Sequence, residues 1–319
     1  MTDTDTSRGQ QSDSALPDAT RVATDVIENV EEVIVGHHDE IEHLVVAILG
    51  RGHVLLEDVP GVGKTMLARA VAASVDGAFK RIQFTPDLLP TDVTGVNVFN
   101  QKTQEFEFRP GPIFGNVVLG DEINRAPPKT QSALLEAMEE GQVTTDGTTH
   151  AVPQPFTVIA TQNTVEQNRA YDLPMAELDR FMTKLHLGYP DEAEEAAMLG
   201  SVVGHHPIEK LSPVASIDAL ATARNTVAEV TVEEAIREYA TRLARYTRER
   251  AQLGVSPRGS LSLLRAAQGR AVLEGRPYVV PDDVQQEAPV VLPHRIQTDS
   301  SEQTAEALVA KALETVAVE

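Results

Sequence analysis

The chain has 319 residues with 27 Lys and Arg against 48 Asp and Glu, a formal net charge of −21, and no cysteine. Its length exceeds the roughly 250 to 300 residues at which one core usually stops growing, and predicts a large domain plus a smaller one. The negative charge disfavours nucleic acids and anionic membranes as partners. The lack of cysteine excludes disulfides, thiolate metal sites and thiol nucleophiles.

The N-terminal part of the sequence gives no sign of a targeting or membrane segment. The longest aliphatic run near the start, Val45–Leu49, is far shorter than the roughly 18 residues that span a bilayer. The first residues are polar and lack the basic-then-apolar pattern of a secretory signal. We therefore expect a cytoplasmic protein without membrane insertion.

The first 189 residues predict an α/β domain. Residues 1–18 are rich in Thr, Ser, Asp and Gln, and are expected to form a disordered acidic tail. Apolar spacing then predicts one helix from Thr20 to Gly36 and a second over Ile41–Leu49. Short segments after these helices fit five strands of a parallel sheet, flanked by helices, within 19–189: His53–Glu57, Lys80–Gln83, Asn116–Gly120, Phe156–Thr161 and Thr183–Leu187.

Two segments interrupt this alternation, and a third follows it. Residues 94–109 and 142–155 alternate apolar and polar positions around polar turns, which predicts two hairpin inserts. From residue 190 onward the strand signals stop and apolar residues recur at helical spacing. We therefore expect a small all-helical domain over 190–319.

A glycine-rich turn between the first predicted strand and the following helix is the strongest local signal. Such a turn points backbone N–H groups and a helix N-terminus at one spot, which suits phosphate. The Lys64 ammonium is expected to reach the β and γ phosphates, and the Thr65 hydroxyl to bind Mg²⁺. Asp58 stands where the common pattern has its first Gly. The residues predicted to bind ATP are Val59, Pro60, Gly61, Val62, Gly63, Lys64, Thr65 and Met66.

Two further strand ends carry polar side chains that phosphoryl transfer needs. Asp121 and Glu122 end a buried strand, where Asp121 would hold Mg²⁺ and Glu122 would act as general base on a water. Asn163 ends another strand and could bind the γ-phosphate or that water. Arg180 and Arg258 are lone arginines, for which a structural ion pair is the default interpretation.

The order of these motifs resembles the MoxR family of AAA+ ATPases. The segments that carry the resemblance are VLLEDVPGVGKT (54–65), DEINRAPPKTQSALLEAMEE (121–140), ATQN (160–163), DLPMAELDRFM (172–182) and SPRG (256–259). It implies an AAA+ P-loop core followed by a helical lid, with the two hairpins as the family's inserts. It further implies an ATPase that forms a ring, usually a hexamer, and acts as a chaperone-like remodelling or maturation factor, often with a partner carrying a von Willebrand factor A domain.

The resemblance also assigns roles to single residues. Lys64 and Thr65 match the Walker A residues, and Asp121 and Glu122 the Walker B pair. Asn163 matches sensor 1, Arg180 the arginine finger that faces a neighbouring subunit, and Arg258 sensor 2 in the lid, which we expect to act on the nucleotide of its own chain.

Some alternatives remain open at this point. The segment 167–170 departs from the family pattern and makes Arg169 a rival to Arg180, with Arg125 next in line. The chain could be a slowly hydrolysing, nucleotide-gated binding scaffold, which would not need an intact Glu122, Asn163 and Arg180. A DNA-motor relative is disfavoured by the net charge of −21. The protein client and the partner cannot be identified from the sequence.

Overall fold

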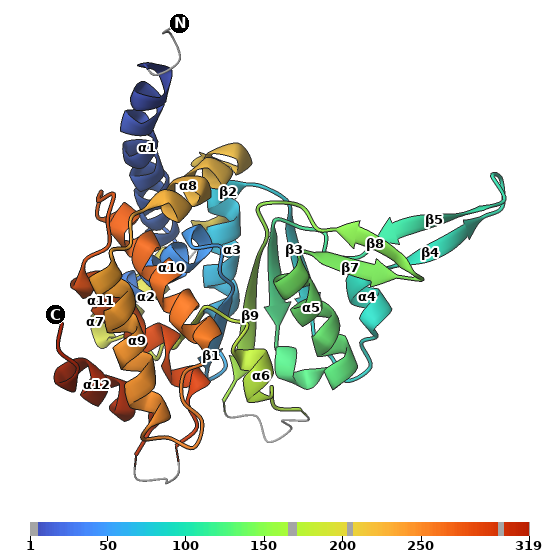
Figure 1. Ribbon diagram of the computed structural model, residues 1–319. Coiled ribbons are helices and arrows are strands. Elements are labelled where there is room, and N and C mark those ends of the chain that lie inside the picture. The colour runs from blue at the N-terminus through green and yellow to red at the C-terminus, as the bar shows by residue number, and fades with distance from the viewer. Residues whose placement is uncertain (1–5, 165–170, 203–206, 299–302, 319) are drawn as a thin grey trace, which may run out of the picture.

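The computed structural model describes residues 6–164, 171–202, 207–298 and 303–318. A five-stranded parallel sheet lies at its centre (Figure 1). Because every pair in this sheet is parallel, the carboxyl ends of the strands meet at one edge. All five predicted strands are confirmed, in the spatial order β10 (Thr183–Leu185), β1 (Val54–Asp58), β9 (Thr157–Asn163), β6 (Val117–Asp121) and β3 (Phe79–Gln83).

Two apolar layers cover the two faces of the sheet. Leu56, Leu119 and Ile159 belong to the larger core, which includes residues of α1 (Thr6–Glu31), α2 (His38–Leu49) and α3 (Lys64–Ser74). Leu55 and Val118 belong to the smaller core on the side of α5 (Pro128–Glu140). The alternation follows from the two-residue period of a strand, and explains why the buried strands read as continuous apolar runs.

The prediction of a disordered tail over 1–18 is wrong for the residues that the structure describes. Helix α1 begins at Thr6, and Leu16 already packs against the larger core. Ala19 and Ala23 are buried in that core. Adding a turn to an existing helix costs far less than nucleating one, so the helix extends into the polar segment.

Both predicted hairpins are confirmed, and they project together from the sheet on the side away from the C-terminal helices (Figure 1). Asn97 donates a hydrogen bond of 2.8 Å to Asp146, which links one hairpin to the turn of the other. The rings of Phe108 and His150 stack with centroids 3.8 Å apart. The elements of this region are α4 (Pro90–Thr94), β4 (Gly95–Asn100), β5 (Glu105–Pro110), β7 (Gln142–Thr145) and β8 (Thr148–Ala151).

In the described part of the chain after residue 190 the elements are helices, as predicted, apart from β11 (Ala215–Ser216), which pairs with β2 (Val75–Asp76). Its helices share the larger core with α1 and α2, so this part packs directly on the N-terminal helices. Among the described residues no helix is long and apolar enough to cross a membrane. The helices are α7 (Glu192–Val202), α8 (Ile217–Glu229), α9 (Glu234–Arg248), α10 (Pro257–Leu273), α11 (Pro281–Val291) and α12 (Ala305–Thr315); the short helical turns are α6 (Met175–Leu178), η1 (Ile123–Arg125), η2 (Pro207–Lys210) and η3 (Pro293–Arg295).

Candidate active site

The predicted phosphate loop joins the carboxyl end of β1 to the first turn of α3. Gly61 and Gly63 have φ of +92° and +94°, a left-handed conformation that glycine adopts without strain. The Lys64 side chain is 7% exposed, and its Nζ donates to the backbone carbonyls of Asp58 at 2.8 Å and Val59 at 2.7 Å. The ammonium therefore already lies over the loop where phosphate would bind.

Asp121 brings the predicted metal ligands together beside this loop. Its carboxylate accepts hydrogen bonds from the Thr65 hydroxyl at 3.3 Å and from the buried Thr161 hydroxyl at 2.6 Å. Arg81 on β3 also contacts it at 2.6 Å, a contact that no pattern in the sequence indicates. A carboxylate and a hydroxyl side by side are the hard oxygen donors that Mg²⁺ prefers, so Thr65 and Asp121 fit the metal they were predicted to hold.

Glu122 is held in a defined position by three donors. Its Oε1 accepts from Asn163 Nδ2 at 2.9 Å, and its Oε2 accepts from Gln83 Nε2 at 2.8 Å and from Arg125 Nη1 at 2.7 Å. Its φ of +56° is left-handed, and its N–H donates to the Thr161 hydroxyl at 2.9 Å. Strain of this kind in a non-glycine residue persists only where the surroundings impose it, and it is frequent at functional sites.

A hollow of about 400 Å³ collects most of the predicted site at the carboxyl edge of the sheet. The phosphate loop, Glu122 and Asn163 all contribute to its lining. Its lining contains Pro60, Gly61, Gly63, Lys64, Thr65, Met66, Arg81, Gln83, Asp121, Glu122 and Asn163.

A second, largely apolar hollow of about 370 Å³ adjoins the first, and the sequence does not predict it. Gly61, Gly63 and Met66 line both hollows, so the two form one continuous site. Its walls come from the turn between α1 and α2, the segment after β10 and α7, and include Val33, Ile34, Val35, His37, Leu187, Tyr189, Pro190 and Met198. In the sequence Val33 and Ile34 stand at helical spacing with core residues. That spacing predicts only that they are buried, and gives no sign that they line a hollow.

Arg180 and Arg258 lie together, but away from the phosphate loop. The Glu139 carboxylate, at the end of α5, accepts from Arg180 Nη2 at 3.3 Å and also from Arg258 Nη2. Neither arginine is among the described residues that line the two hollows of the nucleotide site. The expectation that Arg258 serves the nucleotide of its own chain therefore disagrees with this arrangement. Arg169 lies outside the described residues, and Arg125 contacts Glu122 within its own chain.

The position of Arg258 follows from how the start of α10 is anchored. Ser256 caps this helix and donates to Asp179 at 3.1 Å. Arg295 donates to the same Asp179 at 2.8 Å, and a Cβ on Gly259 would lie 2.7 Å from its side chain. The segments LDRF (178–181) and SPRG (256–259) thus dock on each other, which spacing in the sequence could not show.

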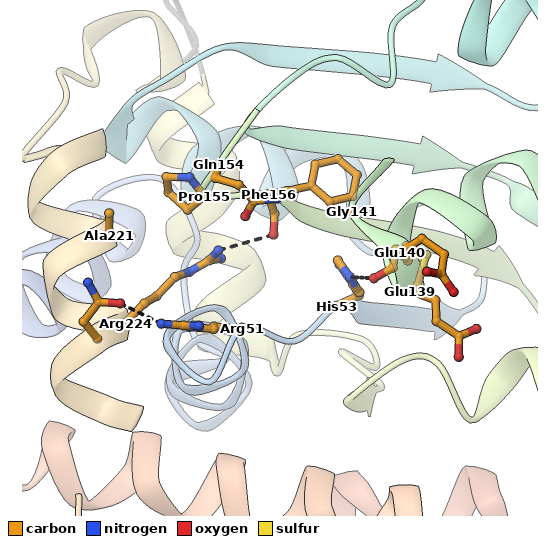
Figure 2. Close-up of a pocket in the computed structure, with 12 residues that line it drawn as sticks. Arg51, His53, Glu139, Glu140, Gly141, Gln154, Pro155, Phe156, Ala221 and Arg224 are labelled. Carbon is orange, nitrogen blue, oxygen red and sulfur yellow. Dashed lines mark hydrogen bonds between the residues drawn. The ribbon is translucent and has the colours of Figure 1, made fainter. Parts of the chain in front are cut away.

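A third hollow, of about 490 Å³, lies at the amino ends of the strands, between α8 and the end of α5 (Figure 2). Arg224 from α8 is 5% exposed and donates to the Phe156 carbonyl at 3.3 Å and to the Thr157 hydroxyl. Burial, and then the charge of Arg51, lower the pKa of Arg224 to about 10. On the far side of the hollow His53 contacts the Met138 carbonyl (Figure 2).

The burial of a neutral His53 should lower the free energy of unfolding in acid. Its Nδ1 accepts from the Val158 N–H at 3.0 Å, so its Nε2 donates to the Met138 carbonyl at 3.1 Å and the ring is neutral. Burial lowers the pKa of His53 from 6.5 to about 4, the hydrogen bond to Met138 opposing and Arg224 adding to the shift. The unfolded chain therefore takes up a proton as pH falls through 6.5, whereas the folded chain does not until about pH 4.

We expect His53→Gln to flatten this pH dependence. Glutamine keeps one acceptor and one donor but does not titrate. Between pH 7 and 4.5 the native chain should lose about 2 kcal/mol more free energy of unfolding than the variant, measured by denaturant titration at fixed high salt. Equal losses in the two proteins would mean that His53 does not carry the effect.

Comparison with known proteins supports the fold. Residues 53–183 match the ATPase family associated with various cellular activities (AAA), and residues 243–312 match the AAA lid domain. A solved structure from Cytophaga hutchinsonii is 35% identical, covers 98% of this chain and 99% of that one, and superposes with a TM-score of 0.90. The uncharacterised Bacillus subtilis protein YeaC is 55% identical over 85% of both chains.

The family follows from a relative whose name states a function. Chaperone MoxR1 of Mycobacterium tuberculosis is 40% identical over 91% of this chain and 80% of its own length. This similarity spans the sheet domain and the helical region alike, and the chain belongs to the MoxR family of AAA+ ATPases.

Proposed function

We propose that this chaperone-like AAA+ ATPase hydrolyses ATP with Mg²⁺ in the two joined hollows, and uses the energy to remodel or mature a protein client. The observation that carries the proposal is the geometry of Glu122. Its carboxylate is fixed by Asn163 and Gln83 at the rim of a hollow that also contains Lys64. A positioned carboxylate beside a phosphate cradle is the arrangement that activates water for phosphoryl transfer.

Each residue then has a definite task. The backbone of the loop and Lys64 bind the phosphates, while the apolar hollow between the α1–α2 turn and the segment after β10 takes the base. Thr65 and Asp121 would hold Mg²⁺, which when bound neutralises charge on the phosphate oxygens. Glu122 accepts a proton from the attacking water, and Asn163 orients that water or the γ-phosphate.

Lys64→Ala tests the phosphate loop directly. The variant loses the buried cation that would pair with the triphosphate, so ATP affinity should fall roughly 10- to 100-fold, the usual scale for a hydrogen bond to a charged group. The measurement is calorimetric titration with ATP and Mg²⁺ in high salt. Unchanged affinity would contradict the assignment of the loop.

We further propose that Arg180 and Arg258 act on the nucleotide of a neighbouring copy in a homo-oligomeric ring, with a hexamer as the assembly to test. One observation supports this. Both arginines gather on Glu139 rather than in their own nucleotide hollows, and both side chains remain partly exposed.

The hairpins favour a protein client over DNA. The β4–β5 hairpin carries an exposed aromatic pair, Phe99 and Phe106, with ring centroids 5.3 Å apart and Phe106 71% exposed. In this hairpin Lys102 and Arg109 are balanced by Glu105 and Glu107, so it has no net positive charge to attract a phosphate backbone. We therefore propose a cytoplasmic machine whose inserts contact a protein, with a von Willebrand factor A domain protein as a candidate partner.

A DNA-binding assay at several salt concentrations tests the alternative of a DNA motor. Tight binding that weakens steeply with salt would favour that alternative, because release of counterions from DNA gives such a dependence. The absence of binding at low salt would support the protein client.

A further inference from the structure

Asp58 occupies the position of the first glycine in the common phosphate-loop pattern, and its side chain joins two separate parts of the site. The Oδ1 atom accepts from the backbone N–H of Val59 at 2.7 Å, and Oδ2 accepts from the backbone N–H of Gly188 at 2.6 Å. The residue is only 9% exposed. Hydrogen bonds to a carboxylate are stronger than those between neutral groups, so this bridge ties the loop to the segment after β10.

Gly188 lies within the wall of the base hollow. Its φ is +70°, so the chain turns there through a left-handed conformation. Leu187 before it, and Tyr189 and Pro190 after it, line the apolar hollow. Fixing the Gly188 N–H therefore fixes the segment that forms this wall.

We propose that Asp58 is a positioning residue for the nucleotide base, because it holds the Leu187–Pro190 wall against the phosphate loop. The inference rests on the proposed ATP site, and it assigns different roles there to the backbone and the side chain of Asp58. In the phosphate cradle, Lys64 is held by the backbone carbonyl of Asp58, which every residue at this position would supply. The wall that faces the base, by contrast, is held by the carboxylate of the side chain.

The test compares two ligands that share phosphates but not a base. Asp58→Gly gives the loop its common first glycine and leaves the Gly188 N–H without this acceptor. We expect its dissociation constant for ATP to rise about tenfold, because ATP binding must then order a wall that the native chain already holds in place. Its dissociation constant for inorganic tripolyphosphate should stay within about twofold of the native value, because the cradle keeps its backbone contacts. Both are measured by calorimetry with Mg²⁺ in the same buffer.

Two variants sharpen the result. Asp58→Asn has one acceptor oxygen for two backbone donors, and should lie between Asp58→Gly and the native chain in ATP affinity. Glu57→Gln is the matched control. The Glu57 carboxylate, next to Asp58 on β1, pairs with Lys184 on β10 at 2.8 Å and not with Gly188. It should leave both dissociation constants unchanged.

A double-mutant cycle identifies the route of the effect. If Asp58 acts through the wall, Asp58→Gly should cost little further ATP affinity once Tyr189→Ala has removed part of that wall. Equal losses for ATP and tripolyphosphate, no loss for either, or full additivity with Tyr189→Ala would each overturn the inference. Failure of the proposed function looks different, since the native chain itself would then not bind ATP.

Discussion

Glu122→Gln should bind ATP as tightly as the native chain while its turnover falls roughly 10²- to 10⁴-fold, the usual contribution of a general base. The amide oxygen can still accept from Gln83 and Arg125, and the amide NH₂ can donate to Asn163 if that side-chain amide turns over, but the side chain cannot take a proton from water. Steady-state ATP turnover and calorimetric binding, measured on the same preparation, separate the two effects. A parallel loss of binding and turnover would indicate that Glu122 has a structural role instead.

The same variant separates a remodelling ATPase from a nucleotide-gated scaffold. A scaffold recruits its partner in the ATP state and needs little hydrolysis, so native turnover would already be as slow as that of Glu122→Gln. A remodelling machine turns over ATP and is trapped by the substitution. Affinity capture on Glu122→Gln with ATP should then retain client and partner longer than the native chain does.

The sequence predicts the sheet and the phosphate side of the site well because their signals are local. The three strands that carry the site are short apolar runs, and the chemistry follows at their carboxyl ends: Lys64 after β1, Asp121 and Glu122 at the end of β6, and Asn163 at the end of β9. A parallel sheet brings such ends to one edge, so the meeting of these four residues follows from the strand pattern alone. Asn163 donates a hydrogen bond to Glu122, so the ends of β9 and β6 do meet in the structure.

Other parts of the site depend on contacts between distant segments. Arg81 and Gln83 on β3 reach the two acids only because β3 pairs with β6 in a register that sets Gln83 opposite Asp121. The position of Arg258 depends on Ser256 and Arg295 both meeting Asp179. No periodicity or motif encodes such pairings, so the sequence could assign Arg258 a role but not a location.

Arg180→Ala should lower turnover by roughly 10³- to 10⁵-fold, the usual contribution of an arginine finger. Arg180 rests on Glu139 instead of facing its own phosphate loop, so the cation it supplies should reach the nucleotide of another copy. Turnover per native subunit should consequently rise with protein concentration as copies associate. Turnover that stays constant across concentrations at which the protein changes from monomer to oligomer would contradict this.

Mixing variants gives the decisive form of this prediction. Glu122→Gln and Arg180→Ala are each nearly inactive alone, but in a mixed ring an Arg180→Ala subunit with intact Glu122 can receive the finger of a Glu122→Gln neighbour. Random mixing in equal amounts places about a quarter of the interfaces in this state, so a clear fraction of native turnover should return. Glu122→Gln mixed with Lys64→Ala is the matched control, because both residues serve the same chain's site and every site then keeps one defect. Recovery in both mixtures, or in neither when subunit exchange has been demonstrated, would mean that Arg180 does not act across the interface.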